Sequence, residues 1–236
     1  MISNRIARIN QLLDKRQPDL TVCMENVHKP HNLSAVVRTA DAVGVHRVHA
    51  IWSRNNAHLG NSTASGSQKW VDVANHYSLD DALQTLKSEN MQILATHLSD
   101  ESVDYREIDY TKPTAIMLGT EKFGISEQAI AAADHCIVIP MVGMVQSLNV
   151  SVANALVLYE AQRQRQAAGM YDTPRLAKAE RDRVLFEGGH PIFAQACIRK
   201  GLPYPAIDEN GEIIASDEWW QKMQMDQSAW QHIDDE

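Results

Sequence analysis

The 236-residue sequence predicts an α/β fold in which a parallel sheet is flanked by helices. Short apolar runs alternate with longer amphipathic runs between residues 20 and 167, and strands that alternate with helices pair in parallel. The composition, 44% hydrophobic and 22% charged, is ordinary for a globular protein. We therefore expect a central α/β domain over residues 20–167, an N-terminal helical extension over 1–19 and a C-terminal helical extension with an acidic tail over 168–236.

The individual elements follow from hydrophobic periodicity and from residues that break helices. Residues 3–16 are predicted to form an amphipathic helix, which Pro18 ends. The predicted strands cover residues 20–27, 45–52, 70–77, 91–98, 114–120 and 136–141. The predicted helices cover residues 32–44, 79–90, 126–134, 147–166, 174–189 and 191–201. The small and polar residues 54–68 are predicted to form a loop.

Several classes of protein are disfavoured by what the chain contains. No apolar run is long enough to span a bilayer, and the first residues lack the apolar core of a signal peptide, so we expect a cytoplasmic protein. The cysteines are three and far apart, which predicts reduced and buried thiols: Cys23, Cys136 and Cys197. Histidines pair at 28 and 31 and at 46 and 49, but without the further ligands that a zinc site needs. We therefore expect no membrane and no metal.

The net charge of −8 is concentrated at the C-terminus. Nine acidic residues and one lysine follow Ile207, so the rest of the chain is neutral overall. Basic residues cluster in two stretches, at Arg5, Arg8, Lys15 and Arg16 and at Arg163, Arg165, Arg175, Arg181 and Arg183. Such local patches bind phosphates whatever the total charge is. The alternative is that they are solvated helix faces.

Polar and glycine residues mark the ends of several predicted strands, where parallel sheets bind their ligands. Asn32 and Arg38 follow the first strand, Gly119 and Glu121 follow another, and Ser147 begins a segment with Asn149 after the last. Each also has a structural interpretation, as a helix cap, a turn glycine or a surface carboxylate. The glycine patterns of dinucleotide-binding folds and P-loops and the nucleophile elbow are absent.

Three segments, "NLSAVVRT" (32–39), "LGTEKFGI" (118–125) and "IPMVGMVQSLNVSVA" (139–153), resemble the ordered motifs of the SpoU branch of the SPOUT methyltransferases. The flanking text "KRQPDLTVCMENVHKPHN" and "LFEGGHPIFAQACIRKGLPYP" is similar to the members that methylate guanosine 18 in the tRNA D-loop. One departure is Ser34, where many relatives carry Gly, but Ser is small enough for close packing.

This resemblance implies a SPOUT fold with a C-terminal trefoil knot and S-adenosyl-L-methionine-dependent 2′-O-methylation of a tRNA ribose. It implies cofactor binding by Thr96, Leu98, Gly119, Ile139, Met144, Ser147 and Leu148. It implies catalytic roles for Arg38, Asn32, Glu121, Ser147 and Asn149. RNA contacts are expected from Arg5, Arg8, His31, Arg163 and Arg165.

The resemblance makes Arg38 the candidate general base, although a free guanidinium has a pKa of about 12.5–13.8. A second interpretation is that its rigid fork only clamps a phosphate. A third is a surface ion pair with Asp41, three positions on.

A homodimer is also expected, and the apolar run Val150, Ala153 and Val157 suits such an interface or, alternatively, the core. A ribosomal RNA methyltransferase, which often carries an additional N-terminal domain, and an inert RNA-binding module are the competing functions.

Overall fold

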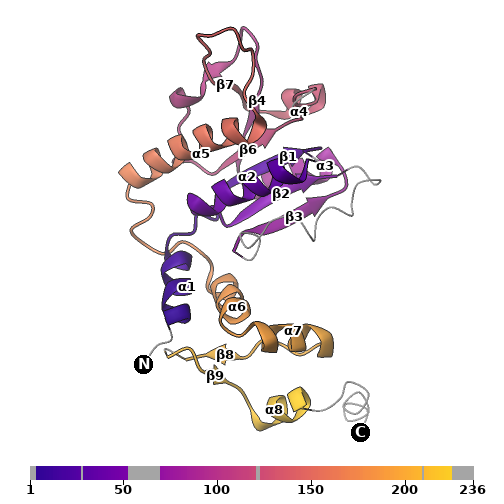
Figure 1. Cartoon of the computed structure of the whole chain (residues 1–236), viewed down its shortest axis with the longest axis vertical. Helices are drawn as coiled ribbons and strands as arrows, with labels where there is room; N and C mark the ends of the chain where they lie inside the picture. The colour runs from indigo at the N-terminus through magenta and orange to yellow at the C-terminus, as the bar shows by residue number, and fades with distance from the viewer. Residues whose placement is uncertain (1–3, 28, 53–69, 121–122, 209, 225–236) are drawn as a thin grey trace. The chain divides into compact units, whose positions relative to one another are not determined.

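The computed structural model describes residues 4–27, 29–52, 70–120, 123–208 and 210–224 (Figure 1). The chain divides into two compact units. The larger unit is Lys15–Arg175, and the smaller unit combines Met1–Asp14 with Leu176–Glu236.

The larger unit is built on a seven-stranded sheet in the order β3-β2-β1-β6-β4-β7-β5, in which every pair is parallel. Its strands are β1 (Leu20–Glu25), β2 (Arg47–Ile51), β3 (Asp72–His76), β4 (Gln92–Thr96), β5 (Val103–Asp104), β6 (Thr114–Leu118) and β7 (His135–Val138). Its helices are α2 (Pro30–Ala42), α3 (Leu79–Ser88), α4 (Glu127–Ala132) and α5 (Val150–Ala167), with a 3-10 turn η3 at Tyr105–Glu107. The predicted parallel α/β fold is confirmed. The two-residue strand β5 was not predicted, because so short a run carries no periodicity.

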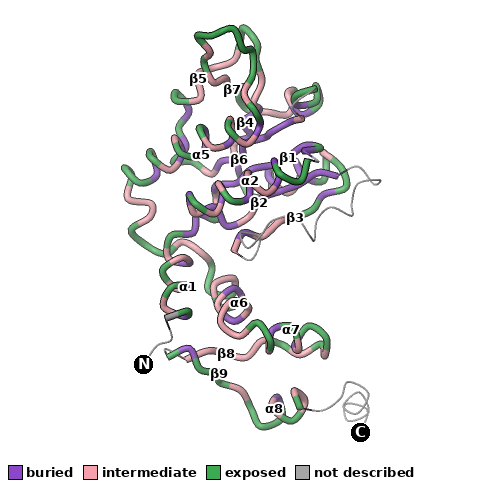
Figure 2. Tube along the Cα trace, viewed as in Figure 1, coloured by how far each residue is buried: buried purple, intermediate pink, exposed green. Residues whose placement is uncertain are grey.

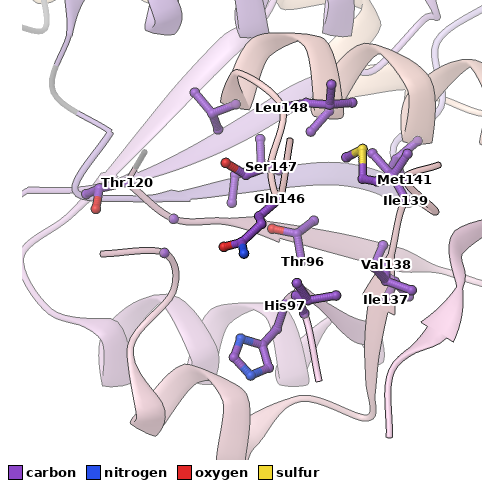
Figure 3. A pocket seen from close by; sticks show the side chains of 17 residues that line it. Thr96, His97, Thr120, Ile137, Val138, Ile139, Met141, Gln146, Ser147 and Leu148 are labelled. Carbon is purple, nitrogen blue, oxygen red and sulfur yellow. The ribbon is translucent and has the colours of Figure 1, made fainter. Parts of the chain in front are cut away.

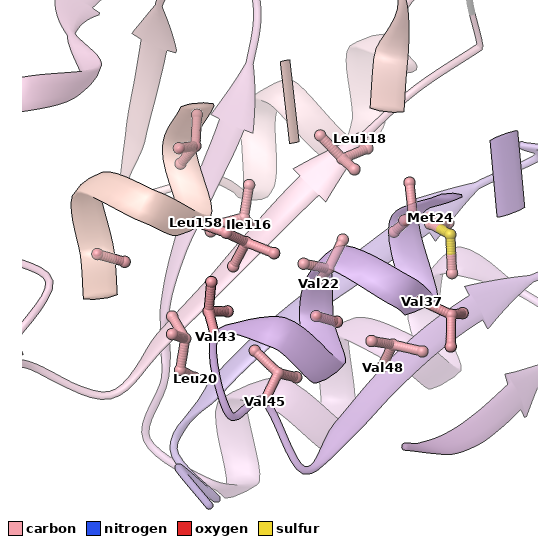
Figure 4. Packing of buried hydrophobic residues seen from close by; sticks show 14 of the residues in the cluster. Leu20, Val22, Met24, Val37, Val43, Val45, Val48, Ile116, Leu118 and Leu158 are labelled. Atoms are coloured by element: carbon pink, nitrogen blue, oxygen red, sulfur yellow. The ribbon is translucent and has the colours of Figure 1, made fainter. Parts of the chain in front are cut away.

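Both faces of the sheet are covered, and alternate residues of its central strands therefore enter two separate cores. Leu20, Val22 and Met24 of β1 pack with residues of α2 and α5 (Figure 4), whereas Cys23 packs with residues of α3 and α4. Figure 2 shows the central strands as the most continuously buried part of the trace. The near-continuous apolar runs of β1 and β6 follow from this double coverage.

Arg165 lies inside the protein, at the edge of the sheet where β1 and β6 begin. Its side chain is 0% exposed and pairs with Asp19 at 2.7 Å. It also donates to the carbonyl oxygens of Tyr110, Asp19 and Lys112 at 2.8, 3.0 and 3.0 Å. The prediction that Arg165 contacts RNA is therefore wrong, because all of its fork is used to hold the segments that lead into two strands. The basic residues near the end of the predicted helix 147–166 gave no sign that one of them is buried.

The boundaries of the units differ from those expected at residues 19 and 167. Arg175 pairs with Asp19 at 2.8 Å, and the Tyr171 hydroxyl donates to the Val43 carbonyl at 2.7 Å. The segments before β1 and after α5 thus belong to the larger unit through side-chain contacts, which sequence periodicity does not register.

The smaller unit contains α1 (Asn4–Asp14), α6 (Lys178–Gly189), α7 (Pro191–Lys200), α8 (Asp217–Gln224) and an antiparallel hairpin of β8 (Ala206–Ile207) and β9 (Ile213–Ile214). The hairpin departs from the helical extension that we expected. The Asp208 carboxylate accepts from the amides of Asn210 and Glu212, and Gly211 has φ +88°. The Asn-Gly pair was the sequence signal for this turn.

The expectations about membrane spans, metal ligands and cysteines can be compared with the described residues. In this part of the chain no helix is long and apolar enough to cross a membrane, and no three potential ligands gather where they could hold a metal ion. The histidine His49 instead shares a 2.9 Å hydrogen bond with His76. The cysteines Cys23 and Cys197 are free and buried, and Cys136 is free and half-buried. The loop expected over 54–68 lies outside the described residues.

Candidate functional site

A cavity of about 280 Å³ lies at the carboxyl ends of β4, β6 and β7 (Figure 3). A water molecule takes up about 30 Å³, so the cavity has room for part of a small organic molecule. Its walls come from the residues that follow these three strands and from the first turns of α5. They are Thr96, His97, Leu98, Leu118, Gly119, Thr120, Gly124, Ile137, Val138, Ile139, Met141, Gln146, Ser147, Leu148, Val150, Ala153 and Val157. The site lies at the edge of the sheet where the sequence predicted it.

One wall of the cavity depends on glycine. Thr120 and Gly124 exchange two backbone hydrogen bonds of 2.9 and 2.8 Å, which closes a tight loop after β6. A Cβ atom at Gly119 would lie 2.0 Å from the Gly124 carbonyl oxygen. Gly124 itself has φ +68°, a conformation that L side chains rarely adopt. Gly119 is therefore required by the close approach of two backbone segments, and Gly124 by its left-handed backbone conformation.

Six of the seven residues expected to hold the cofactor line this cavity. They are Thr96, Leu98, Gly119, Ile139, Ser147 and Leu148. The seventh, Met144, is fully exposed outside the lining, and Met141 supplies its thioether to the wall instead (Figure 3). Met141, rather than the expected Met144, is therefore the methionine of this loop that lines the cavity.

Two asparagines that were expected to be catalytic lie next to each other. Asn32, 2% exposed in the first turn of α2, accepts a 3.3 Å hydrogen bond from the side-chain amide of Asn149. The Asn149 side-chain oxygen Oδ1 also accepts from the Ser151 backbone amide at 2.9 Å and so caps α5. The hydrogen bond between the two asparagines joins residues that are 117 positions apart. The helix cap that was expected at Ser147 lies two residues later, at Asn149, and the helix begins at Val150.

Arg38 is exposed on α2, and no described residue pairs with its guanidinium. The surface pair with Asp41 does not form, because Asp41 bonds to the buried Arg16 at 2.6 Å. Arg38 is not one of the residues that line the cavity. An exposed arginine whose nearby acid is already used has its whole fork available for an external anion.

The remaining expected residues lie in varied surroundings. Glu121 lies outside the described residues. His31 is exposed in the first turn of α2. Arg163 is 67% exposed and forks onto Glu160 at 2.9 and 2.7 Å. In the smaller unit Arg5 and Arg8 are exposed, and Arg5 donates to the Gly188 carbonyl at 2.6 Å.

The structure also brings in polar side chains that the sequence reasoning missed. His97, Thr120 and Gln146 line the cavity. The only sequence signal was adjacency, since His97 stands between Thr96 and Leu98 and Gln146 directly precedes Ser147. Nothing in a motif tells which neighbour of a motif residue turns its side chain toward a ligand.

Comparisons with known proteins place the chain in a family. The model of the SpoU rRNA methylase family matches residues 19–159, and that of the SpoU rRNA methylase C-terminal region matches residues 163–216. A tRNA (guanosine(18)-2′-O)-methyltransferase of Escherichia coli strain K12 is 60% identical over 95% of this chain and 99% of its own length.

Solved structures give the same result. The A. aeolicus TrmH/SpoU tRNA modifying enzyme has a TM-score of 0.70 at 44% identity, over 78% of this chain and 94% of that one. An AdoMet-bound rRNA methyltransferase from Sinorhizobium meliloti has a TM-score of 0.56 at 30% identity, over 64% of this chain and 59% of that one. The first family model alone spans more than half of the sequence, including all three motifs. The chain belongs to the SpoU rRNA methylase family.

Proposed function

We propose that this protein transfers a methyl group from S-adenosyl-L-methionine to the ribose 2′-hydroxyl of guanosine 18 in the D-loop of tRNA. The choice of tRNA rests on the 60% identity with a curated enzyme of that name, which covers 95% of this chain. The alternative, a ribosomal RNA ribose methyltransferase, has support in the description of the family and in the S. meliloti structure.

The geometric observation that carries the proposal is the hydrogen bond between Asn32 and Asn149. It ties the start of the helix that presents Arg38 to the start of the helix that forms one wall of the cavity. Methyl transfer between two bound partners depends mainly on their alignment. A direct link between the two elements serves that alignment.

The cavity fits a group with an apolar body and a polar end. Buried Leu118, Ile137 and Val157 form its inner wall, and exposed Gln146 and Ser147 form part of its rim. When bound, S-adenosylmethionine supplies an electrophilic methyl on a sulfonium. The protein residues have to orient the two partners, exclude water and assist removal of the hydroxyl proton.

Arg38 is the residue that we assign to the RNA side of the reaction. Its unpaired fork suits a bidentate contact with a phosphate next to the reacting ribose. That contact would orient the 2′-hydroxyl, and a guanidinium placed in this way would also face the departing proton. Asn32, Ser147 and Asn149 would position the ribose, and Glu121 completes the set taken from the motif.

RNA affinity would come from exposed basic groups that contact phosphates rather than bases. Arg5, Arg8, His31 and Arg163 keep this role in the proposal. Arg163 would exchange its ion pair with Glu160 for a phosphate. A mutation that removes one of these phosphate interactions should lower the salt slope of binding by about 0.9.

We further propose that the protein acts as a homodimer in the cytoplasm. The interface expected at Val150, Ala153 and Val157 is misplaced, because these residues line the cavity and Val157 is fully buried. The opposite face of α5 carries Val152, Leu156 and Tyr159 at 47, 40 and 53% exposure. Apolar side chains gathered on one exposed helix face mark an association surface.

We expect a second protomer to pack against that face. Light scattering at micromolar concentration should give twice the monomer mass of 26.4 kDa, and a monomer would contradict this part of the proposal. The trefoil knot stays a prediction from the family.

The experiment that tests the function supplies labelled S-adenosylmethionine with an unmodified tRNA transcript, the same transcript carrying adenosine at position 18, and ribosomal RNA. We expect label only in the first, in a dinucleotide resistant to alkali, because a 2′-O-methyl group prevents cleavage of the adjacent phosphodiester. Label in ribosomal RNA alone would favour the alternative substrate. Label in neither would contradict enzymatic activity.

A further inference from the structure

The cavity is polar at one end and apolar at the other. Leu118, Ile137 and Val157, which are at most 2% exposed, line its inner part. Gln146 is exposed and His97 is half-buried. A ligand that fits this arrangement places its apolar portion inside and its charged portion at the opening.

The polar side chains around the cavity differ in whether they already form hydrogen bonds within the protein. The Thr96 hydroxyl donates to the Met117 carbonyl at 3.0 Å, and the Thr120 hydroxyl accepts from the Phe123 amide at 3.0 Å. His97 and Gln146 make no side-chain hydrogen bond with any residue that the structure describes. Figure 3 shows the amide of Gln146 extending toward the side formed by Thr96 and His97.

We propose that His97 and Gln146 bind the amino-acid end of S-adenosylmethionine, while its adenosine occupies the apolar part. This inference rests on the proposed function. The amino-acid end is a zwitterion with one carboxylate and one ammonium group. The Gln146 amide offers both a donor and an acceptor, and the His97 imidazole offers a further donor to the carboxylate.

The described side chains at the opening of the cavity are uncharged dipoles. None of the lining residues that the structure describes is Asp, Glu, Lys or Arg. Uncharged dipoles can bind a zwitterion, because a donor faces its carboxylate and an acceptor faces its ammonium group. The two side chains come from separate loops, so they can hold the carboxylate and the ammonium at the same time.

The test compares two ligands that share adenosine and a thioether sulfur but differ at the end in question. S-adenosylhomocysteine carries the amino-acid end, and 5′-methylthioadenosine lacks it. By calorimetry, Gln146→Ala and His97→Ala should each weaken S-adenosylhomocysteine about 3- to 10-fold, the range expected for a single hydrogen bond. Binding of 5′-methylthioadenosine should change less than about twofold, and it also shows that each variant is folded.

Matched control variants are available away from the cavity. Gln195→Ala truncates an exposed glutamine on α7, and His135→Ala truncates an exposed histidine at the opposite end of β7. Both controls should leave the affinity for the two ligands unchanged. An equal loss for both ligands in Gln146→Ala and His97→Ala, or no loss for either, would overturn the inference. If the wild-type protein bound neither ligand and methylated no RNA, the proposed function itself would fail instead.

Discussion

Arg16 and Arg165 lie at the edge of the sheet where the strands begin, and both are buried with hydrogen-bond partners for nearly all of their donors. Arg38 lies on the helix that follows the opposite edge, and its guanidinium has no partner among the described residues. Arg16 donates to the Val45 and Trp70 carbonyls at 2.8 and 2.7 Å, ahead of β2 and β3. Arg165 does the same ahead of β1 and β6. The same side chain thus serves structure at one edge and is available for chemistry at the other.

This contrast shows why residue type alone did not separate the two roles. Arg163 and Arg165 stand in one basic stretch, yet one is 67% exposed and the other 0%. A buried arginine needs acceptors for most of its donors, because an unpaired buried charge is costly; of the donors on Arg16 and Arg165, only the Arg16 Nε has no partner within the described residues. An exposed arginine without a partner does not hold other segments of the fold in place.

The largest effect should follow removal of the unpaired guanidinium. Arg38→Ala is expected to lower the single-turnover rate of methyl transfer by about 10²–10⁴-fold, because the variant lacks a positioning or proton-transfer group. Cofactor affinity should change little, since Arg38 is outside the cavity lining. A near-normal rate would remove Arg38 from the mechanism.

The opposite pattern is expected at the buried edge. Arg165→Met should lower the free energy of unfolding by about 3–5 kcal/mol, because several buried carbonyl oxygens would lose their donor and Asp19 would keep only Arg175. Urea denaturation measures this. For the fraction that stays folded, the salt dependence of tRNA binding should be unchanged. A lower salt slope would mean that Arg165 contacts phosphate after all.

A pH dependence is expected from the outer strands. The pKa of His49 is lowered from 6.5 to about 4, first by burial and second by the neighbouring His76. His76 in turn bonds to Asp81 at 3.0 Å, and Arg47 and Asp72 also act on His49. The folded state therefore binds this proton less readily than the unfolded state does.

The contribution of neutral His49 to the free energy of unfolding should then be fully present above pH 6.5. The free energy of unfolding should fall by up to about 3 kcal/mol as the pH drops toward 4. Urea titrations at several pH values measure this. In His49→Gln the part of the fall due to His49 should vanish, with His135→Gln, an exposed histidine, as control. An identical pH profile in wild type and His49→Gln would contradict the assignment.

The smallest effect concerns an apparent defect in the core. Asn154 is 0% exposed on the inner face of α5, and neither its amide nitrogen nor its carbonyl oxygen has a hydrogen-bond partner within the described residues. Asn154→Leu, of similar shape, should raise the free energy of unfolding by about 1–2 kcal/mol because it removes two unpaired buried groups. A decrease in stability would show that a buried water binds there.

Much of the architecture could be predicted from the sequence, for physical reasons that vary by element. The strand β1 and helix α2 were predicted because continuous and three-to-four-residue apolar periods differ clearly. The helix α2 nevertheless begins at Pro30 rather than Asn32, since proline is tolerated in a first helical turn. Six of the seventeen residues that line the cavity were predicted, from motif residues whose backbone position is fixed by the fold.

What could not be predicted depends on side-chain direction and on long-range contact. The exchange of Met141 for Met144 depends on how one loop turns, and no residue pattern specifies that turn. The burial of Arg165 depends on Asp19, which is 146 positions away. The hydrogen bond between Asn32 and Asn149 has the same origin, because only the folded sheet brings its two ends together.

The most direct measurement substitutes lysine at both kinds of arginine, which keeps the charge and removes the planar fork. Single-turnover methyl transfer and urea unfolding would be measured side by side for Arg38→Lys and Arg165→Lys. We expect Arg38→Lys to lose about 10-fold or more in rate with its unfolding free energy within about 0.5 kcal/mol of wild type. Arg165→Lys should lose about 2 kcal/mol or more of stability, with the rate of the folded enzyme within about twofold of wild type. Loss of the same property in both variants would contradict the division between a structural edge and a chemical one.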